Sequence, residues 1–160
     1  MSTISEIIKD AHKKLQKLLE NYIMSNGNVD DQQSWSNQFR QDFIRHSTAE
    51  ELILFPAYEK YIKENNTELI HQSQRDHREM KKLLFILDLT TITDPKYRFI
   101  FDQLIELFHK HIQREQNQNL PKLEEVLIPD QSSSLANDFQ QAKYSSNLKV
   151  YPTSSVNPPL

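Results

Sequence analysis

The sequence contains no cysteine and only one glycine among its 160 residues. The absence of cysteine excludes disulfides, iron–sulfur clusters, thiolate-bound zinc and thiol nucleophiles. A single glycine excludes glycine-rich phosphate-binding loops and leaves few turns that need a positive φ. Long apolar runs are also missing, and none approaches the roughly 18 to 20 residues that span a membrane. A helical protein whose chemistry uses nitrogen and oxygen ligands is therefore expected.

Charge of one sign is not concentrated anywhere in the chain. The net charge is −3, and lysine and arginine are scattered among aspartate and glutamate, so no basic stripe indicates a nucleic-acid partner. The N-terminus is polar and acidic, unlike a signal peptide, so the cytoplasm is the expected compartment. The 37% hydrophobic content is enough to fill one core.

Apolar residues recur at helical spacing in four stretches, over residues 4–24, 34–65, 67–90 and 95–127. Ser34, Thr67 and Asp94 are the expected N-caps, and Pro95 follows at the first helical position. Pro56 interrupts the second stretch without a loop signature, so a kink within one long helix is expected there. Short connections make neighbouring helices antiparallel. Residues 1–128 are therefore predicted to form one all-α domain, an up-down-up-down four-helix bundle.

Residues 129–160 differ in composition, being rich in serine, asparagine and proline. Leu135, Phe139 and Ala142 are the only residues in this segment at helical spacing. The segment is predicted to be a mostly irregular tail, mobile or partly docked.

Histidine and glutamate fill gaps in the apolar stripes of all four predicted helices. Residues three or four apart share a helix face, so these side chains should point inward, and each histidine lies near the middle of its helix. Antiparallel packing brings those middles to one level. The converging residues are His12, His46, Glu50, His77, His111 and Glu115.

Six buried polar groups need compensation, because each would cost several kcal/mol without a partner. Metal ions provide it, and imidazole with carboxylate but no thiolate favours iron or manganese over structural zinc. Two bridging glutamates and four histidines suit two ions with open positions for a small ligand such as dioxygen. One alternative is a structural bundle in which these groups only pair with one another.

The other two histidines, His71 and His109, form a rival pattern. Each follows a glutamate by three residues, as in ferritin-like di-iron bundles. Glu106 lies opposite the core and Glu68 lies in a first turn, so we expect these four residues to be on the surface. Glu51 is off the stripe and expected to be exposed, with a role beside the metal as the alternative.

The chain resembles the hemerythrin-like HHE cation-binding domains over about residues 4–128. The resemblance rests on His12, on His77, on the two H-x-x-x-E motifs of His46–Glu50 and His111–Glu115, and on Pro56 and Pro121 downstream. It implies a four-helix bundle around a non-haem di-iron centre whose ligands are the six converging residues. Oxygen carriers of this family have a further histidine where this chain has Ser73, and end with H-x-x-x-x-D. The departures favour the branch that senses iron or oxygen or handles reactive species.

The function expected from the sequence is therefore binding of a small diatomic or peroxide ligand at two iron ions, in storage, sensing or stress protection. The alternative is a di-iron enzyme acting as a peroxidase, a ferroxidase or in nitric-oxide handling. A protein partner is compatible with sensing, but no sequence feature identifies it.

Overall fold

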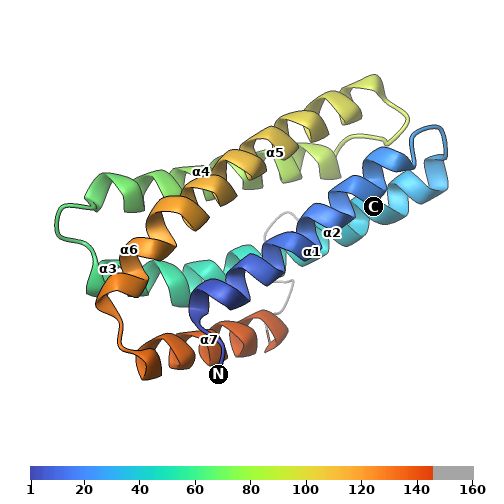
Figure 1. Cartoon of the computed structure of the whole chain (residues 1–160). Coiled ribbons are helices and arrows are strands. Elements are labelled where there is room, and N and C mark those ends of the chain that lie inside the picture. Colours follow the sequence, from blue (N-terminus) through green and yellow to red (C-terminus); the bar gives the residue numbers. More distant parts are fainter. Residues whose placement is uncertain (146–160) are drawn as a thin grey trace.

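The structure is a computed structural model that describes residues 1–145, and within these residues every regular element is helical. Two helical hairpins lie side by side, as Figure 1 shows. The first pairs α1 (Ile4–Met24) with α2 (Val29–Ala49), and the second pairs α4 (Thr67–Asp88) with α5 (Pro95–Arg114). This confirms the predicted all-α, up-down-up-down bundle.

The helix starts follow from local capping. Thr3 and Glu6 form a capping box at the start of α1, and the Asp94 side chain accepts a hydrogen bond from the backbone of Lys96 at the start of α5. Asn28 caps α2 by accepting from Asp31, so this helix begins five residues before the expected Ser34. An Asn cap followed by two acidic residues favours this earlier start.

Both long helices continue through a wide π-helical turn that the sequence did not predict. After α2 come η1 (Glu50–Leu54) and α3 (Phe55–Tyr61), and after α5 come η2 (Glu115–Asn119) and α6 (Leu120–Val126). In each turn a backbone N–H bonds to the carbonyl five residues earlier, on Glu50 or Glu115. Pro56 and Pro121 are the second residues of α3 and α6, and they have no backbone N–H to donate to the α-helical hydrogen-bond ladder. The expected kink at Pro56 thus takes the form of a widened turn.

The two hairpins repeat at a constant offset of 65 residues. His12 corresponds to His77, His46 to His111, Glu50 to Glu115, and Pro56 to Pro121. Each half therefore supplies one histidine from its first helix and an H-x-x-x-E motif before a π turn of the same length.

The core consists of two apolar clusters. One contains Leu15, Phe43, Met80 and Phe108, and the other contains Ile8 among its members. On α1, His12 lies between Ile8 and Leu15, and the other predicted ligands likewise lie where one cluster gives way to the other. The polar layer thus has apolar packing above and below it.

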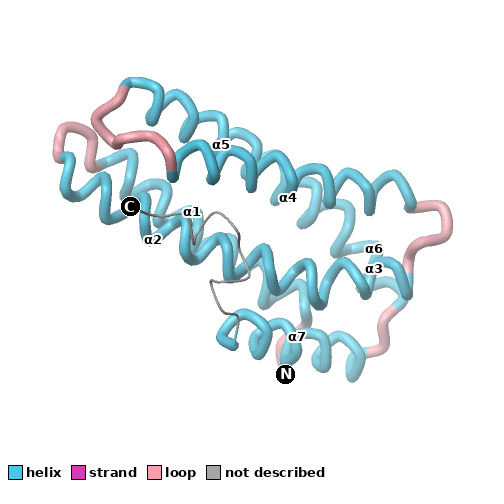
Figure 2. Tube along the Cα trace, turned by 180° about the vertical axis from the view of Figure 1, so that it is seen from behind, coloured by secondary structure: helices cyan, strands magenta, loops and turns pink. Residues whose placement is uncertain are grey.

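The structure differs from the sequence prediction at the C-terminal segment, which was expected to be mostly irregular. Residues 129–145 form a 17-residue helix, α7 (Pro129–Ser145), that packs on α1, α2 and η1 (Figure 2). Phe139 is fully buried in the second cluster, and the Ser132 hydroxyl accepts a buried hydrogen bond from the Ile4 backbone at 3.0 Å. Tertiary packing of one apolar stripe outweighs the weak helix propensity of serine and asparagine. The rest of the predicted tail lies outside the described residues.

None of the helices over residues 1–145 combines the length and the apolar character that crossing a membrane requires.

Candidate metal centre

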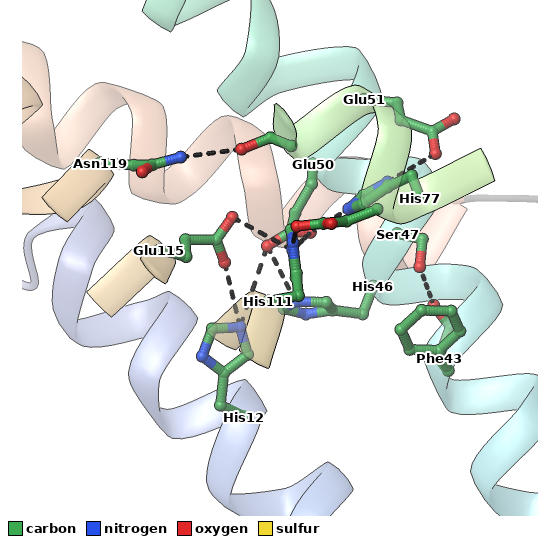
Figure 3. Close-up of polar contacts among 12 residues, drawn as sticks. His12, Phe43, His46, Ser47, Glu50, Glu51, His77, His111, Glu115 and Asn119 are labelled. Carbon is green, nitrogen blue, oxygen red and sulfur yellow. Dashed lines mark hydrogen bonds and ion pairs between the residues drawn. The ribbon is translucent and has the colours of Figure 1, made fainter. Parts of the chain in front are cut away.

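The six residues predicted to converge do lie together at the middle of the bundle (Figure 3). Their side chains come from α1, α2, α4 and α5 and from the first residues of the two π turns. All are at most 3% exposed. The structure therefore confirms the predicted convergence, while their role as metal ligands stays a prediction.

Two overlapping groups of possible ligand atoms can be distinguished among residues 1–145. The first, called site A, consists of His12, His46, Glu50 and Glu115. The second, called site B, consists of Glu50, His77 and His111. Within each group the candidate atoms lie within 4.8 Å of one another, which is compatible with one cation in each place.

Glu50 presents one carboxylate oxygen to each site. Its Oε2 lies 3.0 Å from Nε2 of His46 and 3.9 Å from Nε2 of His12. Its Oε1 lies 3.0 Å from Nε2 of His77 and 3.7 Å from Nε2 of His111.

Glu115 does the same from the opposite half, with Oε1 3.1 Å from His12 Nε2 and Oε2 3.6 Å from His111 Nε2. Both glutamates are thus oriented as bridges between the sites.

Most of these inward atoms have no hydrogen bond in the described part of the chain. The unpartnered atoms are Nε2 of His12, His46 and His111, Oε2 of Glu50 and both oxygens of Glu115. Buried polar atoms without hydrogen bonds are costly and rare in native proteins. Close approach without hydrogen-bond geometry is what atoms aimed at a shared cation would show, so this donor set fits a metal centre.

The electrostatics lead to the same conclusion. Burial opposes the positive charge of His12, but the Glu115 and Glu50 carboxylates outweigh it and raise its pKa to about 9. Burial dominates at His46 and lowers its pKa to about 4. Burial and the charge of Glu50 raise the pKa of Glu115 to about 7. Burial opposes the charge of Glu50, but the surrounding histidines outweigh it and lower its pKa well below its usual value. Without a cation, the two carboxylates are therefore compensated by protons on His12 and His111 and partly on Glu115.

The outer ring nitrogens of the histidines differ in their partners. Nδ1 of His77 lies 2.7 Å from Glu51, and Nδ1 of His111 lies 3.1 Å from Asp76. Nδ1 of His12 lies 2.7 Å from the side-chain oxygen of Gln116. Nδ1 of His46 has no hydrogen-bond partner among residues 1–145, and its ring contacts Phe139 at 5.6 Å between centroids. The hydrogen bonds at Nδ1 of His12, His77 and His111 fix the tautomer that directs Nε2 at a metal.

A second polar group adjoins the centre on the side of Glu115. The Asn119 amide donates to the Ser73 hydroxyl at 2.8 Å, and the side-chain oxygen of Asn119 has no partner within residues 1–145. The hydroxyl of Tyr58 is also buried without a hydrogen bond there. Burial and the charges of Glu115 and Glu50 raise the pKa of Tyr58 well above its usual value. Ser73 thus supports a neighbouring amide.

A surface cavity of about 900 Å³ opens beside site B. Its lining includes His77, Glu51, Lys81 and Phe55. Glu51 bonds both to His77 and to Lys81 at 2.7 Å, so this ion pair and the imidazole it contacts line the same cavity.

Outside the six residues, the sequence expectations had mixed outcomes. His71 and His109 are exposed, as are Glu68 and Glu106, which confirms that the rival pattern lies on the surface. Glu51 is half-buried and contacts His77, so the expected exposure is wrong, while a role beside the metal stays a prediction.

Four further residues around the site were not singled out from the sequence: Tyr58, Asp76, Gln116 and Asn119. Asp76 and Gln116 are the immediate sequence neighbours of His77 and Glu115, which is a signal that could have found them.

Comparison with known proteins agrees with the fold and with a cation-binding domain. The family model of the hemerythrin HHE cation binding domain matches residues 3–125 of this chain. A hemerythrin-like protein of Schizosaccharomyces pombe is 30% identical over 159 residues, which cover 99% of this chain and 78% of the yeast protein. A DNA nickase of a Nostoc species is 26% identical over 142 residues, and the match covers 88% of this chain but only 39% of the nickase.

The fold also matches a solved structure. The crystal structure of a hemerythrin HHE cation binding domain-containing protein from Mycobacterium kansasii superposes with a TM-score of 0.76 at 19% identity, covering 99% of this chain and 96% of that chain. With a buried cluster of histidine and glutamate suited to cations and a family match over most of its length, this chain belongs to the hemerythrin HHE cation binding domain family.

Proposed function

We propose that this chain is a non-haem di-iron protein that binds a small ligand such as dioxygen, nitric oxide or peroxide, in storage, sensing or stress protection. The observation that carries the proposal is the position of Glu50 and Glu115, each with one oxygen toward site A and the other toward site B. Two bridging carboxylates and four imidazoles supply about eight donor contacts against roughly twelve for two octahedral ions.

Iron is favoured because every donor is nitrogen or oxygen and thiolate is absent. A manganese or mixed pair would use the same residues. When bound, the ions supply Lewis-acidic, redox-active positions for the small ligand. The chain orients three of the four imidazoles through their outer nitrogens. It limits water access with the buried rings of Phe108 and Phe55, which lie 6.3 Å from His12 and 4.7 Å from His77 between centroids.

Metal analysis after anaerobic preparation with ferrous iron tests this proposal. We expect about two iron ions per chain and near-ultraviolet absorption typical of a bridged di-ferric centre after exposure to air. His77→Ala should lower the iron content, whereas His109→Ala, which removes an exposed histidine, should not. Less than about one iron per chain, unchanged by His77→Ala, would contradict the proposal and favour a purely structural cluster.

The alternative function, a di-iron enzyme, is favoured by the hydroxyl of Tyr58 and the amide oxygen of Asn119, which are buried and unpartnered within the described residues. A phenol can donate a proton, and an amide oxygen can accept a hydrogen bond that positions the bound peroxide. Peroxide consumption with many turnovers per chain, reduced by Tyr58→Phe at unchanged iron content, would support the enzyme. Stoichiometric binding without turnover would support the binding protein.

The remaining properties are also proposals. We place the protein in the cytoplasm, with a small diatomic or peroxide ligand. The net charge of −3 gives no electrostatic support for a nucleic-acid partner. A sensor would act through a protein partner.

A further inference from the structure

The ligand framework is symmetric between the two halves of the chain, but its surroundings are not. At the 65-residue offset, Glu51 corresponds to Gln116, and Asp76 corresponds to Ala11. These are the positions that contact, or could contact, the outer nitrogens of the histidines. The repeat therefore carries a carboxylate at both such positions beside site B and at neither beside site A.

Both histidines of site B donate to carboxylates that are themselves held in place. Glu51 bonds to Lys81 at 2.7 Å, and Asp76 pairs with Arg114. Asp76 is 3% exposed, so its contact with His111 is shielded from water. A hydrogen bond to a carboxylate is stronger than one to an amide and increases the electron donation of the imidazole to a metal.

The histidines of site A have weaker support. His12 is backed by the neutral amide of Gln116, and Nδ1 of His46 has no hydrogen-bond partner in the described chain. The residue at the position matching Asp76 is Ala11, whose methyl group is buried and offers no acceptor. The His46 ring is therefore positioned by packing, including its contact with Phe139, and no hydrogen bond within residues 1–145 selects its tautomer.

We propose that the two sites are unequal and that site B binds the first cation more tightly than site A. This rests on the proposed function, in that two cations bind between shared glutamates. Each site has two histidines, and Glu50 and Glu115 each approach one site with one oxygen and the other site with the second oxygen, although Glu115 lies closer to site A. The order of binding is therefore set by the carboxylates behind the histidines, Glu51 and Asp76, against this small advantage of site A in ligands. At limiting metal the protein then carries one ion, at His77 and His111, and site A is the position that exchanges.

Anaerobic calorimetric titration of the metal-free protein with ferrous iron tests the inequality. The wild type should show two steps that differ at least about tenfold in affinity. Removing a residue that supports a metal-bound histidine typically costs 10- to 100-fold in affinity, so Glu51→Gln should weaken the tighter step by about that factor. Gln116→Glu should instead strengthen the weaker step, which brings the two affinities together.

Matched variants assign the steps and control for charge. His77→Ala should remove the tighter step and His46→Ala the weaker one. Glu59→Gln removes the same charge within the same cavity from an exposed residue that pairs with Lys63, and should leave both steps unchanged. Circular dichroism and urea unfolding of each metal-free variant verify the fold.

The outcomes separate the two proposals. If the wild type binds no ferrous iron, the proposed function fails. If it binds two ions with a single affinity, or if His46→Ala removes the tighter step, the inequality is overturned while the di-iron function stands. Equal effects of Glu51→Gln and Glu59→Gln would overturn it as well.

Discussion

Replacing Phe139 with alanine should detach α7 from the bundle. The ring is fully buried in the cluster that includes Ile8 and Leu54, and it contacts His46 edge-on. Truncation of a buried phenylalanine to alanine costs about 3 to 5 kcal/mol, because transfer energy is lost and a cavity remains. Since α7 is the last helix of the described chain, it can leave while the bundle persists, so the measured loss is limited by its own docking free energy.

Two probes separate local from global unfolding. The only tryptophan, Trp35, packs against the other core cluster, so its fluorescence in urea reports on the far half of the bundle. Hydrogen exchange of α7 amides reports on docking. Phe139→Ala should accelerate exchange in α7 by about 100-fold or more, since each 1.4 kcal/mol corresponds to a factor of ten. The tryptophan transition should shift less.

The control is Tyr144→Ala, which truncates an aromatic residue of the same helix that is 74% exposed. It should change stability by no more than about 0.5 kcal/mol. If Phe139→Ala and Tyr144→Ala exchange at equal rates in α7, the proposed packing of this helix is refuted.

Three further predictions concern the polar layer. At pH 7, iron binding should release at least about two protons per chain, because His12 and His111, with pKa values raised to about 9 and about 10, must deprotonate, and Glu115, with a pKa raised to about 7, is partly protonated as well. The affinity should therefore fall as the pH is lowered from about 9. Calorimetry in buffers of different ionisation enthalpy measures the release, and its absence would contradict this prediction. A strong chelator should lower the melting temperature of the loaded protein, since ligand at 100 times its Kd contributes about 2.7 kcal/mol; an unchanged melting curve despite complete iron removal would contradict this. In the metal-free protein Tyr97→Phe should cost about 1 kcal/mol because it loses a bond to Ser36. Tyr58→Phe should cost less, because the Tyr58 hydroxyl has no hydrogen bond of good geometry within residues 1–145, and urea unfolding compares the two variants.

The site's inner residues were predictable because helical phase alone places them. The six histidines and glutamates of the site fill gaps in apolar stripes. Their depth in the bundle follows from their position along each helix, because antiparallel helices bring their middles to one level. Their outer partners were not predictable in this way. Glu51 contacts His77 from another helix, and Gln116 contacts His12 across 104 positions of the sequence. Helical periodicity shows which face of one helix a residue occupies, but it does not show which residue of another helix that side chain contacts.

The C-terminal helix was missed for a different reason. Its sequence is rich in serine and asparagine, which favour caps and turns over helix interiors. Leu135, Phe139 and Ala142 did indicate a stripe, but its stabilisation depends on a complementary surface formed by α1, α2 and η1. That surface exists only after the bundle has folded.

The two π turns have a consequence for insertions and deletions. A regular helix rotates about 100° per residue, so adjacent side chains such as Glu50 and Glu51 would diverge. A wide turn accommodates roughly one additional residue while the flanking α-helical segments keep their faces. Each turn is therefore equivalent to a one-residue insertion that the helix tolerates. As a result, two adjacent side chains in each turn contact histidines: Glu50 and Glu51 in the first turn, and Glu115 and Gln116 in the second. Deleting one residue from 51–54 would restore a regular helix with Phe55 still facing the core, at the expense of the second contact.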